Sequence, residues 1–519
     1  MSEKEKQLND AIGLHLETAE RSLASIKGKL TGYDRTALTQ GQQAVMSAQT
    51  AQADLTVELA KPPVIEIPPT QPPPTGGSGA VVFVPAGGNL QAALDNAGPR
   101  SVVEIEAGAK YPGPYTWRNN ASSEYVTLRT RGVQRAGRTK RSDAAGLGQI
   151  MSTALGNAPL KALPGAHHLI MEDVTFTQDV GQTWSLVELG RGEETNYDQV
   201  PHHFIFNRCA MTVPDHIQVR RGIALNAFDV DVIDTAIWNI KEIGNDSQAI
   251  SGRLGGRHRF INSELEGAGE NVIFGGSPAS IANAMVRDVL IENCSLPKNP
   301  KWRKDSPEWD GSNWQIKNNF EVKAGERIKL LNVTMDGCWQ QAQDGCAVLL
   351  TVRCESGVNP WATIQDVHFE NITIKNVGAG FQFLYADDSG HPSVPAKNWT
   401  FRNIYVEATI KRGGSGRIME GSPIENLIVD NVTAITDGTS AYYFRSDHPA
   451  AKGFQFRNIA YLQNLYGFWT EGKPFDTVFP GAVWENVTVG VDGPNTDYPP
   501  PKPSTAISKA AFITKYKKP

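Results

Sequence analysis

The chain has 519 residues, of which 40% are hydrophobic and 20% are charged. This composition excludes wholesale disorder, and the 49 glycines and 32 prolines favour a turn-rich β protein over a helix bundle. The formal net charge of −5 argues against a general nucleic-acid-binding or membrane-surface protein, so we expect neither partner.

Residues 1–60 contain no proline and predict a small helical head. Six apolar residues alternate in steps of four and three, which forms a short heptad seam: Ile12, Leu16, Ala19, Leu23, Ile26 and Leu30. A seam this short needs a partner helix, which the same chain, sister chains or a larger assembly could supply. The first residues lack the long apolar stretch of a secretory signal, so we expect synthesis in a host cytoplasm without a signal peptide.

Residues 61–79 read KPPVIEIPPTQPPPTGGSG and predict a semi-rigid linker with a flexible end. No segment reaches 18 consecutive apolar residues, so we expect no transmembrane helix. The five cysteines form no CxxC pair and no common zinc spacing, which indicates reduced structural thiols and no metal site.

From residue 80 the sequence repeats a short strand pattern in which apolar residues alternate on both sides of a polar pair. Clear copies are FIFNRCAM at 204–211, IKLLNVTM at 328–335 and VHFENITI at 367–374. The second polar position forms a column spaced by 26 to 39 residues: Asp173, Arg208, Asp234, Asn262, Asn293, Asn332, Asn371, Asn403, Asn431, Asn458 and Asn486. One strong strand per period of about 30 residues predicts a β-solenoid whose stacked coils share one core.

We expect the asparagine column to lie at a bend between two strands. Asparagine tolerates the left-handed backbone conformation, and its amide can hydrogen-bond to the coils above and below. The role of the column is therefore structural. Because we expect the chain not to be secreted, we interpret the Asn-x-Thr matches that the column creates as by-products of the repeat.

The segment GGNLQAALDNAGPRSVVEIEAGAKYPGPY at 87–115 resembles the start of right-handed parallel β-helix proteins. In those proteins a short amphipathic helix caps the first coil, here with Leu90, Ala93 and Leu94 facing inward. The resemblance implies an all-β, right-handed parallel β-helix over 80–490, followed by a tail at 491–519. The superfamily contains pectate-lyase-like enzymes, phage tailspikes and many uncharacterised bacterial repeat proteins, and this chain is most similar to the uncharacterised group.

The longest insertions are the most informative places, because loops on a rigid solenoid carry function. One of them, residues 297–325, is called the tryptophan loop here. It carries Trp302, Trp309 and Trp314 among charged residues. Indole faces beside carboxylates suit sugar rings, so we predict carbohydrate contact by these residues, with packing against the helix wall as the alternative. Tyr385, in the turn at 384–399, is a further candidate for substrate binding.

Two enzyme chemistries fit the polar residues near this loop. Hydrolysis needs two carboxylates around a glycosidic bond, for which Glu270, Glu321 and Asp344 are candidates. β-Elimination needs a base such as Lys317 or Arg353, and it often uses Ca²⁺ to neutralise a uronate carboxylate. No tight aspartate cluster of the pectate-lyase type is present, which disfavours elimination, and no cofactor is otherwise expected.

Three further loops carry charge. The turn at 384–399 could bind a cation or a sugar through Asp387, Asp388 and His391, although an exposed turn is the simpler interpretation. The loop at 191–203 is acidic. RTRGVQRAGRTKR at 129–141, called the basic run here, predicts a solvated insertion, with contact to an anionic polymer as the alternative.

A helical head, a proline-rich linker and a β-helix body together resemble a phage tailspike. The resemblance implies a virion protein, on a phage tail or capsid surface, that docks to other virion proteins through residues 1–60. It further implies binding and cleavage of host cell-surface polysaccharide, and a homotrimer by analogy. The second hypothesis is a non-enzymatic virion decoration or adhesin in which the β-helix is a spacer. A polysaccharide enzyme exported without a recognisable signal is a third.

Overall fold

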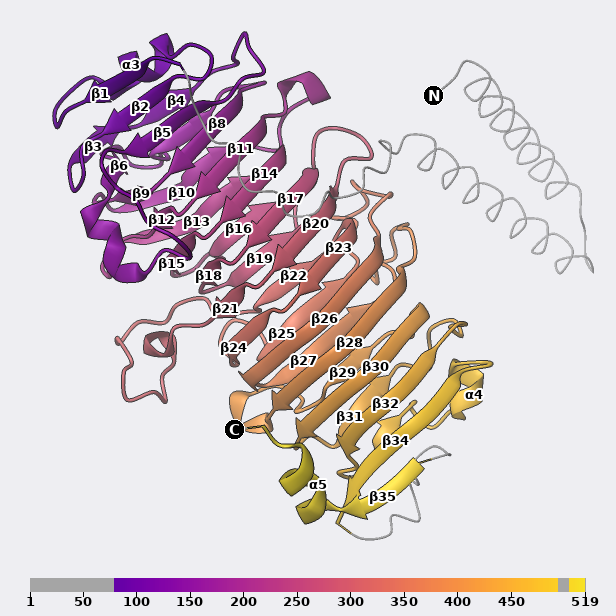
Figure 1. Ribbon diagram of the computed structural model, residues 1–519. Helices are drawn as coiled ribbons and strands as arrows, with labels where there is room; N and C mark the ends of the chain where they lie inside the picture. The colour runs from indigo at the N-terminus through magenta and orange to yellow at the C-terminus, as the bar shows by residue number, and fades with distance from the viewer. Residues whose placement is uncertain (1–78, 493–503, 519) are drawn as a thin grey trace, which may run out of the picture. The chain divides into compact units, whose positions relative to one another are not determined.

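The computed structural model describes residues 79–492 and 504–518. Almost all regular structure in these residues is parallel β-strand, wound into a solenoid of stacked coils (Figure 1). The predicted helical head at 1–60 and all of the predicted linker except Gly79 lie outside the described residues. In the described part, no helix is both long enough and apolar enough to cross a membrane.

Each coil contributes strands to three faces. The first face consists of β1 (Val81–Val84), β2 (Val102–Ile105), β5 (Val126–Thr130), β8 (His167–Glu172), β11 (His202–Asn207), β14 (Ala227–Ile233), β17 (Gly255–Ile261), β20 (Val286–Glu292) and β23 (Gly325–Leu331). The second face consists of β3 (Lys110–Gly113), β6 (Gly148–Ser152), β9 (Val174–Gln178), β12 (Ala210–Met211), β15 (Ala236–Ile240), β18 (Glu264–Gly267), β21 (Ser295–Pro297) and β24 (Thr334–Cys338).

In the later coils, single long strands carry both of these faces. They are β26 (Ile364–Val377), β28 (Lys397–Ala408), β30 (Glu425–Thr436), β32 (Gln455–Leu462) and β34 (Val483–Val491), and β35 (Ser504–Ser508) pairs with the end of β34. The third face is a separate sheet of β4 (Tyr115–Trp117), β7 (Leu160–Ala162), β10 (Gln182–Leu189), β13 (Gln218–Leu225), β16 (Gln248–Gly252), β19 (Glu270–Phe274), β22 (Phe320–Val322), β25 (Cys346–Thr351), β27 (Ala379–Leu384), β29 (Met419–Gly421), β31 (Ser440–Phe444) and β33 (Gly467–Trp469). This winding is a right-handed parallel β-helix.

The asparagine column lies at the corner between the first and second faces, as the sequence predicts. All eleven of its residues, from Asp173 to Asn486, have a left-handed backbone with φ between 46° and 58°. The amides also join successive coils. Asn332 Oδ1 accepts a hydrogen bond from Asn371 Nδ2 at 2.8 Å, and Asn371 Oδ1 accepts one from Asn403 Nδ2 at 2.9 Å. The column therefore satisfies side-chain polar groups at a bend that most residue types would strain.

A second corner column, which the sequence analysis missed, begins the first face. It lies five residues before the asparagine column in every coil, and all its members have positive φ: His168, His203, Asp229, Arg257, Asp288, Arg327, Asp366, Asn398, Asn426, Gly453 and Gly481. Ion pairs hold several neighbours together, such as Arg327 Nε and Asp288 Oδ1 at 2.6 Å. Because the residue types vary, no single-residue pattern marks this column in the sequence.

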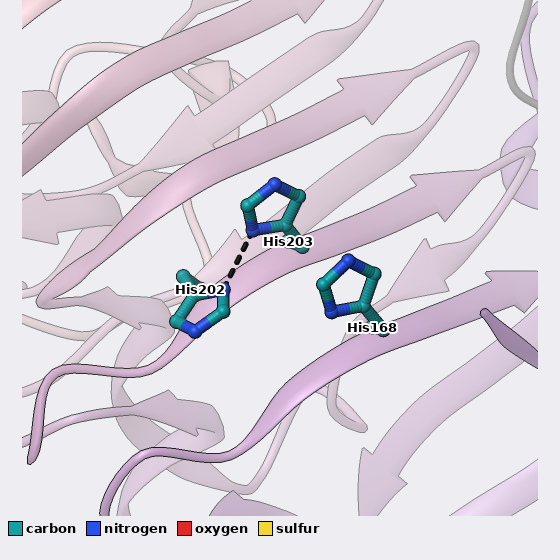
Figure 2. Close-up of side chains that lie close together, drawn as sticks. All are labelled: His168, His202 and His203. Atoms are coloured by element: carbon teal, nitrogen blue, oxygen red, sulfur yellow. Dashed lines mark hydrogen bonds between the residues drawn. The ribbon is translucent and has the colours of Figure 1, made fainter. Parts of the chain in front are cut away.

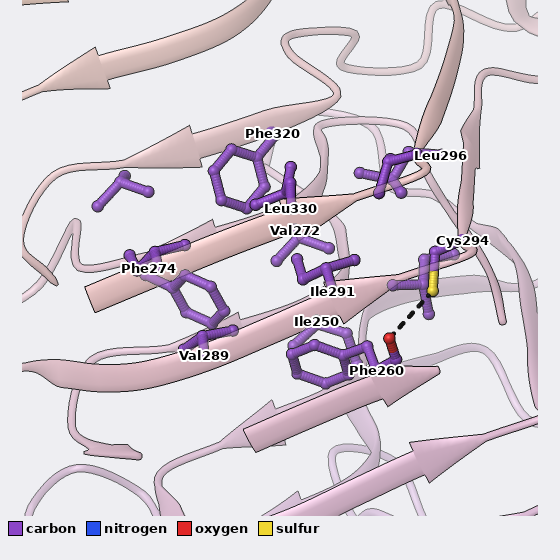
Figure 3. Packing of buried hydrophobic residues seen from close by; sticks show 14 of the residues in the cluster. Ile250, Phe260, Val272, Phe274, Val289, Ile291, Cys294, Leu296, Phe320 and Leu330 are labelled. Carbon is purple, nitrogen blue, oxygen red and sulfur yellow. Dashed lines mark hydrogen bonds between the residues drawn. The ribbon is translucent and has the colours of Figure 1, made fainter. Parts of the chain in front are cut away.

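Apolar side chains from all three faces fill the interior (Figure 3). Phe274 and Phe320 of the third face meet edge to face, with ring centroids 6.2 Å apart. Ile291 and Leu330 of the first face are fully buried in the same cluster. The five cysteines are buried and unpaired, which confirms the predicted reduced thiols.

Short helices cover both ends of the described solenoid. In α3 (Leu90–Asn96), Leu90 and Leu94 are buried as the resemblance implies. The helix α4 (Phe475–Val478) lies between β33 and β34. At the end of the chain, α5 (Lys509–Tyr516) packs the buried Phe512 against the last coils. The tail thus adds a strand to the edge of the last coil and covers part of its outer surface.

Much of the basic run is exposed, as expected for a solvated insertion, but two of its arginines bind the solenoid. Arg135 Nη2 donates to Asp173 Oδ1 at 2.7 Å. Arg138 donates to the backbone oxygens of Asn262 and Asn293, at 2.9 and 2.7 Å. These arginines bind the outside of the asparagine column across several coils, so they are engaged within the protein rather than offered to an anionic polymer.

A buried ammonium anchors the start of the tryptophan loop. Lys298 is 4% exposed, and its Nζ lies 2.6 to 3.0 Å from four backbone oxygens, those of Gly267, Ala268, Gly269 and Asn318, which share its three N–H donors. A charged group this deep is tolerated only when it is fully hydrogen-bonded. Lys298 therefore fixes the start of the loop to the coil below and to Asn318, near the end of the same loop.

Candidate functional site

The outer surface of the third face carries two adjacent hollows. In-register positions on neighbouring strands form one row of side chains along this surface: Lys161, Glu188, Ala224, Ser251, Ile273, Glu321, Leu349, Gln382, Glu420 and Tyr443. Every member of this row lines one of the hollows. Lys323 lines both of them, so the two hollows adjoin, and together they are called the groove here.

The hollow over the later coils, called the acidic hollow here, has a volume of about 1100 Å³. Its acidic lining residues are Glu321, Asp344, Asp388, Glu420, Asp447 and Glu471. Three of the five catalytic candidates from the sequence line it, namely Glu321, Asp344 and Arg353. Residues from β22, β25 and the loops beside them thus come together, although a solenoid turn separates them in the sequence.

Glu321 has the most unusual environment in the acidic hollow. Its side chain is 2% exposed, and its Oε1 lies 3.5 Å from Lys323 Nζ. Its Oε2 is buried and has no hydrogen-bond partner among the described residues. Burial, together with the nearby charge of Glu270, raises the pKa of Glu321 to about 7. Close to neutral pH this carboxyl therefore retains a proton that it can donate.

Two other polar atoms of the acidic hollow also lack hydrogen-bond partners in the described residues. Gln343 Oε1 and Ser415 Oγ are buried, line the same hollow and have no hydrogen-bond partner in the described part of the chain. Buried polar atoms are normally paired, and unpaired ones mark places that bind water or a ligand. The acidic hollow thus offers two unused hydrogen-bonding positions in addition to Glu321.

Glu270 and Lys317 lie close to Glu321 but do not line either hollow. Glu270 Oε2 accepts a hydrogen bond from Gln248 Nε2 at 2.8 Å, and its side chain is 1% exposed. Lys317 Nζ lies 2.5 Å from Asp246 Oδ2 and 3.7 Å from Glu270 Oε1. These contacts place both residues behind the groove, where they influence its charge rather than contact a ligand.

Asp344 and Arg353 differ in how freely they face the groove. Asp344 is exposed, and its Oδ1 accepts a hydrogen bond from Gln340 Nε2 at 3.1 Å. Arg353 forms an ion pair with Asp388 of the turn at 384–399. Asp344 is therefore an accessible carboxylate in the same hollow as Glu321.

The structure does not support sugar contact by Trp302 and Trp314. Trp302 is 1% exposed and Trp314 is 5% exposed, because both pack into one cluster with Trp339. Trp314 Nε1 also donates to Asp310 Oδ2 at 2.8 Å, so the acidic residues of the loop serve its own packing. Only Trp309, at 40%, remains open to solvent. Trp302 and Trp314 therefore fit the alternative interpretation, in which the tryptophans pack the loop.

Tyr385 does not line either hollow. Its ring meets that of His448 edge to face, with centroids 5.0 Å apart, and it packs against the core. The neighbouring Asp387 accepts a hydrogen bond from the backbone N–H of Cys354 at 2.7 Å. This hydrogen bond joins the turn at 384–399 to the loop that follows β25.

The hollow over the earlier coils, called the basic hollow here, was missed by the sequence analysis. Its volume is about 660 Å³, and its charged lining residues are Lys161, Arg191, Arg220, Arg221, Arg253 and Lys323 against Glu188, Glu193 and Asp246. Burial, followed by the charges of Arg220 and Arg253, lowers the pKa of Arg221 to about 10. Cations held this close together favour an anionic ligand.

An exposed tryptophan lies beside this cationic cluster. Trp184 is 51% exposed and lines the basic hollow, and the guanidinium of Arg220 lies 5.3 Å from the centre of its ring. An indole face open to solvent is a suitable platform for a sugar ring. The Arg-Arg pair at 220–221 and this tryptophan are visible in the sequence, but only the fold brings them to one surface.

No family model matches the chain, and no curated protein matches it. Solved structures with a similar fold include an alginate lyase from Paenibacillus sp. str. FPU-7, with 12% identity, a TM-score of 0.41, and coverage of 63% of this chain and 99% of the lyase. The tailspike gp49 from Pseudomonas phage LKA1 has 12% identity, a TM-score of 0.39, and coverage of 82% and 76%. The gp42 tailspike of Acinetobacter phage vb_AbaP_AS12 has 9% identity, a TM-score of 0.36, and coverage of 78% and 59%.

Proposed function

We propose that the groove on the third face binds a polysaccharide and cleaves it by hydrolysis in the acidic hollow. The observation that carries this proposal is Glu321, a buried carboxyl whose pKa is raised to about 7 and whose Oε2 has no partner in the described chain. Glycoside hydrolysis requires a carboxyl with a raised pKa together with a second carboxyl, and Asp344 lines the same hollow as Glu321.

Each carboxyl has a defined task in this reaction. The Glu321 carboxyl donates its proton to the glycosidic oxygen as the bond to the leaving sugar breaks. Asp344, which is exposed, either removes a proton from the attacking water or attacks the anomeric carbon itself. Glu270 lies behind the wall of the hollow, and its negative charge helps to raise the pKa of Glu321.

The two candidate bases for elimination are less suitable. Burial disfavours the ammonium form of Lys317, but Glu270 and Asp246 outweigh burial and raise the pKa of its amine. Arg353 is paired with Asp388. The Lys317 amine therefore stays protonated near neutral pH, and the Arg353 guanidinium is engaged by a carboxylate, which leaves hydrolysis as the better-supported chemistry.

The basic hollow adds a constraint on the substrate. Neighbouring coils are about 4.8 Å apart along the solenoid. A polymer that lies along the groove would therefore cross several coils and contact both hollows. We therefore propose a polysaccharide with acidic groups, such as a capsule or O-antigen chain, whose anionic sugars face Arg221.

The test is digestion of purified capsule and O-antigen polysaccharides by the full chain. We expect new reducing ends with the wild type and none with Glu321→Gln or Asp344→Asn, while binding persists. Glu425→Gln, an exposed carboxylate at the start of β30, is the matched control and should retain activity. Ultraviolet-absorbing unsaturated products instead of saturated ends would overturn hydrolysis.

A non-enzymatic adhesin is the second candidate. It would bind the same polymer through Trp184 and the basic hollow, and no bond would be cleaved. The favourable observation is that the exposed indole and the cations lie in the hollow that lacks Glu321. Binding without products in the digestion assay would select this function.

We also propose that the protein belongs to a virion and attaches through residues 1–60. The order of head, linker and solenoid in the sequence supports this proposal, and a homotrimer joined by the heptad seam is compatible with it. Immunolabelling of purified particles tests the location, and absence of the label from particles would refute it.

A further inference from the structure

Four histidines gather at the start of two neighbouring strands of the first face. His167 and His168 begin β8, and His202 and His203 lie at the same register in β11. The rings stack in two pairs across the coils. The centroids of His167 and His202 are 4.7 Å apart, and those of His168 and His203 are 4.4 Å apart.

Three of these histidines point their nitrogens toward one another (Figure 2). Ligand atoms of His168, His202 and His203 all lie within 4.8 Å of one another. His202 Nδ1 and His203 Nδ1 are 2.6 Å apart. In a tetrahedral zinc site with Zn–N bonds of about 2.05 Å, ligand nitrogens are about 3.4 Å apart. The three nitrogens therefore need only small side-chain rotations to share one ion.

The backbone holds this cluster in place. His168 and His203 belong to the second corner column, with φ of 59° and 60°. Further along the same column, oppositely charged or amide side chains join the coils, such as Arg327 with Asp288. At His168 and His203, by contrast, two imidazoles lie against each other, and a cation between them would take the place of that pairing.

The surroundings provide both access and a negative charge. The side chain of His203 is 39% exposed, so an ion can enter from solvent. Asp229 Oδ2 lies 3.7 Å from His203 Nδ1, although Asp229 also pairs with Arg257, which limits its net attraction for a cation. His167 Nδ1 lies 2.6 Å from His168 Nδ1 and can orient that ring.

We propose that His168, His202 and His203 bind one divalent transition-metal ion, with solvent in the remaining position. Imidazole-only donor sets suit Zn²⁺, Ni²⁺ and Cu²⁺ and are poor ligands for Ca²⁺ and Mg²⁺. The ion would link two successive coils near the start of the solenoid. This site lies on the first face, so it is independent of the proposed polysaccharide groove.

The test is isothermal titration of the full chain, stripped with EDTA, with ZnCl₂, NiCl₂ and CaCl₂. We expect one Zn²⁺ or Ni²⁺ per chain, no Ca²⁺ binding, and a higher midpoint of thermal unfolding with Zn²⁺. Co²⁺ should give the visible absorption of a tetrahedral nitrogen site.

His203→Asn and His168→Asn are the decisive variants. Asn398 occupies the same corner column with φ of 64°, so asparagine removes the imidazole and keeps the bend. Circular dichroism checks that the variants fold. Both should lose the stoichiometric ion, whereas His216→Asn, an exposed histidine elsewhere, should retain it. Absence of Zn²⁺ and Ni²⁺ binding by the wild type, or unchanged binding by folded His203→Asn, would overturn the proposal.

Discussion

Arg138 donates from Nε to the backbone oxygen of Asn262 at 2.9 Å, although 124 positions separate the two residues in the chain. The same guanidinium reaches Asn293 in the next coil. The basic run thus acts as a clip across coils that are also joined by their strands and by the side chains of the two corner columns. A long-range contact of this kind restrains local opening of the solenoid.

We predict that Arg138→Ala destabilises the protein by about 2 kcal/mol, since it removes charge-assisted hydrogen bonds to backbone oxygens. Denaturant unfolding followed by circular dichroism measures the change. Arg131→Ala, in the same run but with a more exposed side chain, should cost less than about 1 kcal/mol. Equal losses in the two variants would contradict the clip.

The asparagine column separates two contributions to stability at one position. Asn403→Gly keeps the left-handed backbone but removes the amide bridges, whereas Asn403→Ala removes the bridges and also strains the backbone. We therefore expect Asn403→Ala to be the less stable variant by about 1 kcal/mol. If thermal and denaturant unfolding rank the two variants the other way round, the bend is not what the column stabilises.

Glu321 should give the activity a pH dependence. Because its pKa is raised to about 7, the carboxyl loses its proton as the pH rises through this value, and kcat/KM should fall with it. The pH profile of polysaccharide digestion measures this decline. A profile that stays flat up to about pH 9 would show that Glu321 is not the acid.

The same shift affects stability. Between the unfolded pKa of 4.5 and about 7, the folded protein binds more protons than the unfolded chain, so Glu321 destabilises the fold progressively as the pH rises. Glu321→Gln removes the cost of ionising this buried carboxyl. Above neutral pH the variant should therefore be more stable than the wild type by up to about 3 kcal/mol. Below about pH 4 the two proteins should differ little, and a constant difference across the range would contradict the assignment.

The basic hollow predicts a charge-selective loss of binding. Arg221→Gln should weaken binding of an anionic polysaccharide by about tenfold, the equivalent of 1.4 kcal/mol, and leave binding of a neutral one unchanged. Arg402→Gln, an exposed arginine on β28, is the matched control. Titrations at two salt concentrations check the result, and an equal effect on the neutral polymer would mean that Arg221 shapes the hollow instead.

Lys298 gives the sharpest prediction for the tryptophan loop. Lys298→Met preserves the length of the side chain but leaves four buried carbonyl oxygens without their donor. We expect a loss of about 3 kcal/mol or more, together with a change in tryptophan fluorescence. Wild-type stability in this variant would show that water replaces the ammonium.

The sequence predicts the solenoid well because the apolar alternation and the asparagine column repeat in almost every coil. Asn371 and Asn403 are recognisable one by one, since each follows the same strand pattern. The second corner column escapes prediction because histidine, aspartate, arginine and asparagine all occupy it. The second corner column can be found only by its position, five residues before the asparagine column, because no residue type is common to it.

The candidate site was only partly predictable. Carboxylates such as Glu321 and Asp344 can be selected by residue type near a long insertion, and the fold places both in one hollow. Burial cannot be read locally, which is why Trp302 and Trp314 looked like sugar-binding residues although they pack together. Trp184 lies in β10, far from the insertions in the sequence, and its exposure depends on neighbours that only the fold provides.

The spacing between the two corner columns is constant, so the first face has the same length in each coil while the rest of the coil varies in length. In every coil from His168 onward, five positions separate the two corners of the first face. The coils therefore differ in length only in the second face, the third face and the loops. The loops that flank the groove can therefore change in length and sequence while the strands and corners of the first face stay the same. New polymer specificities could arise by exchanging these loops without rebuilding the stack that carries them.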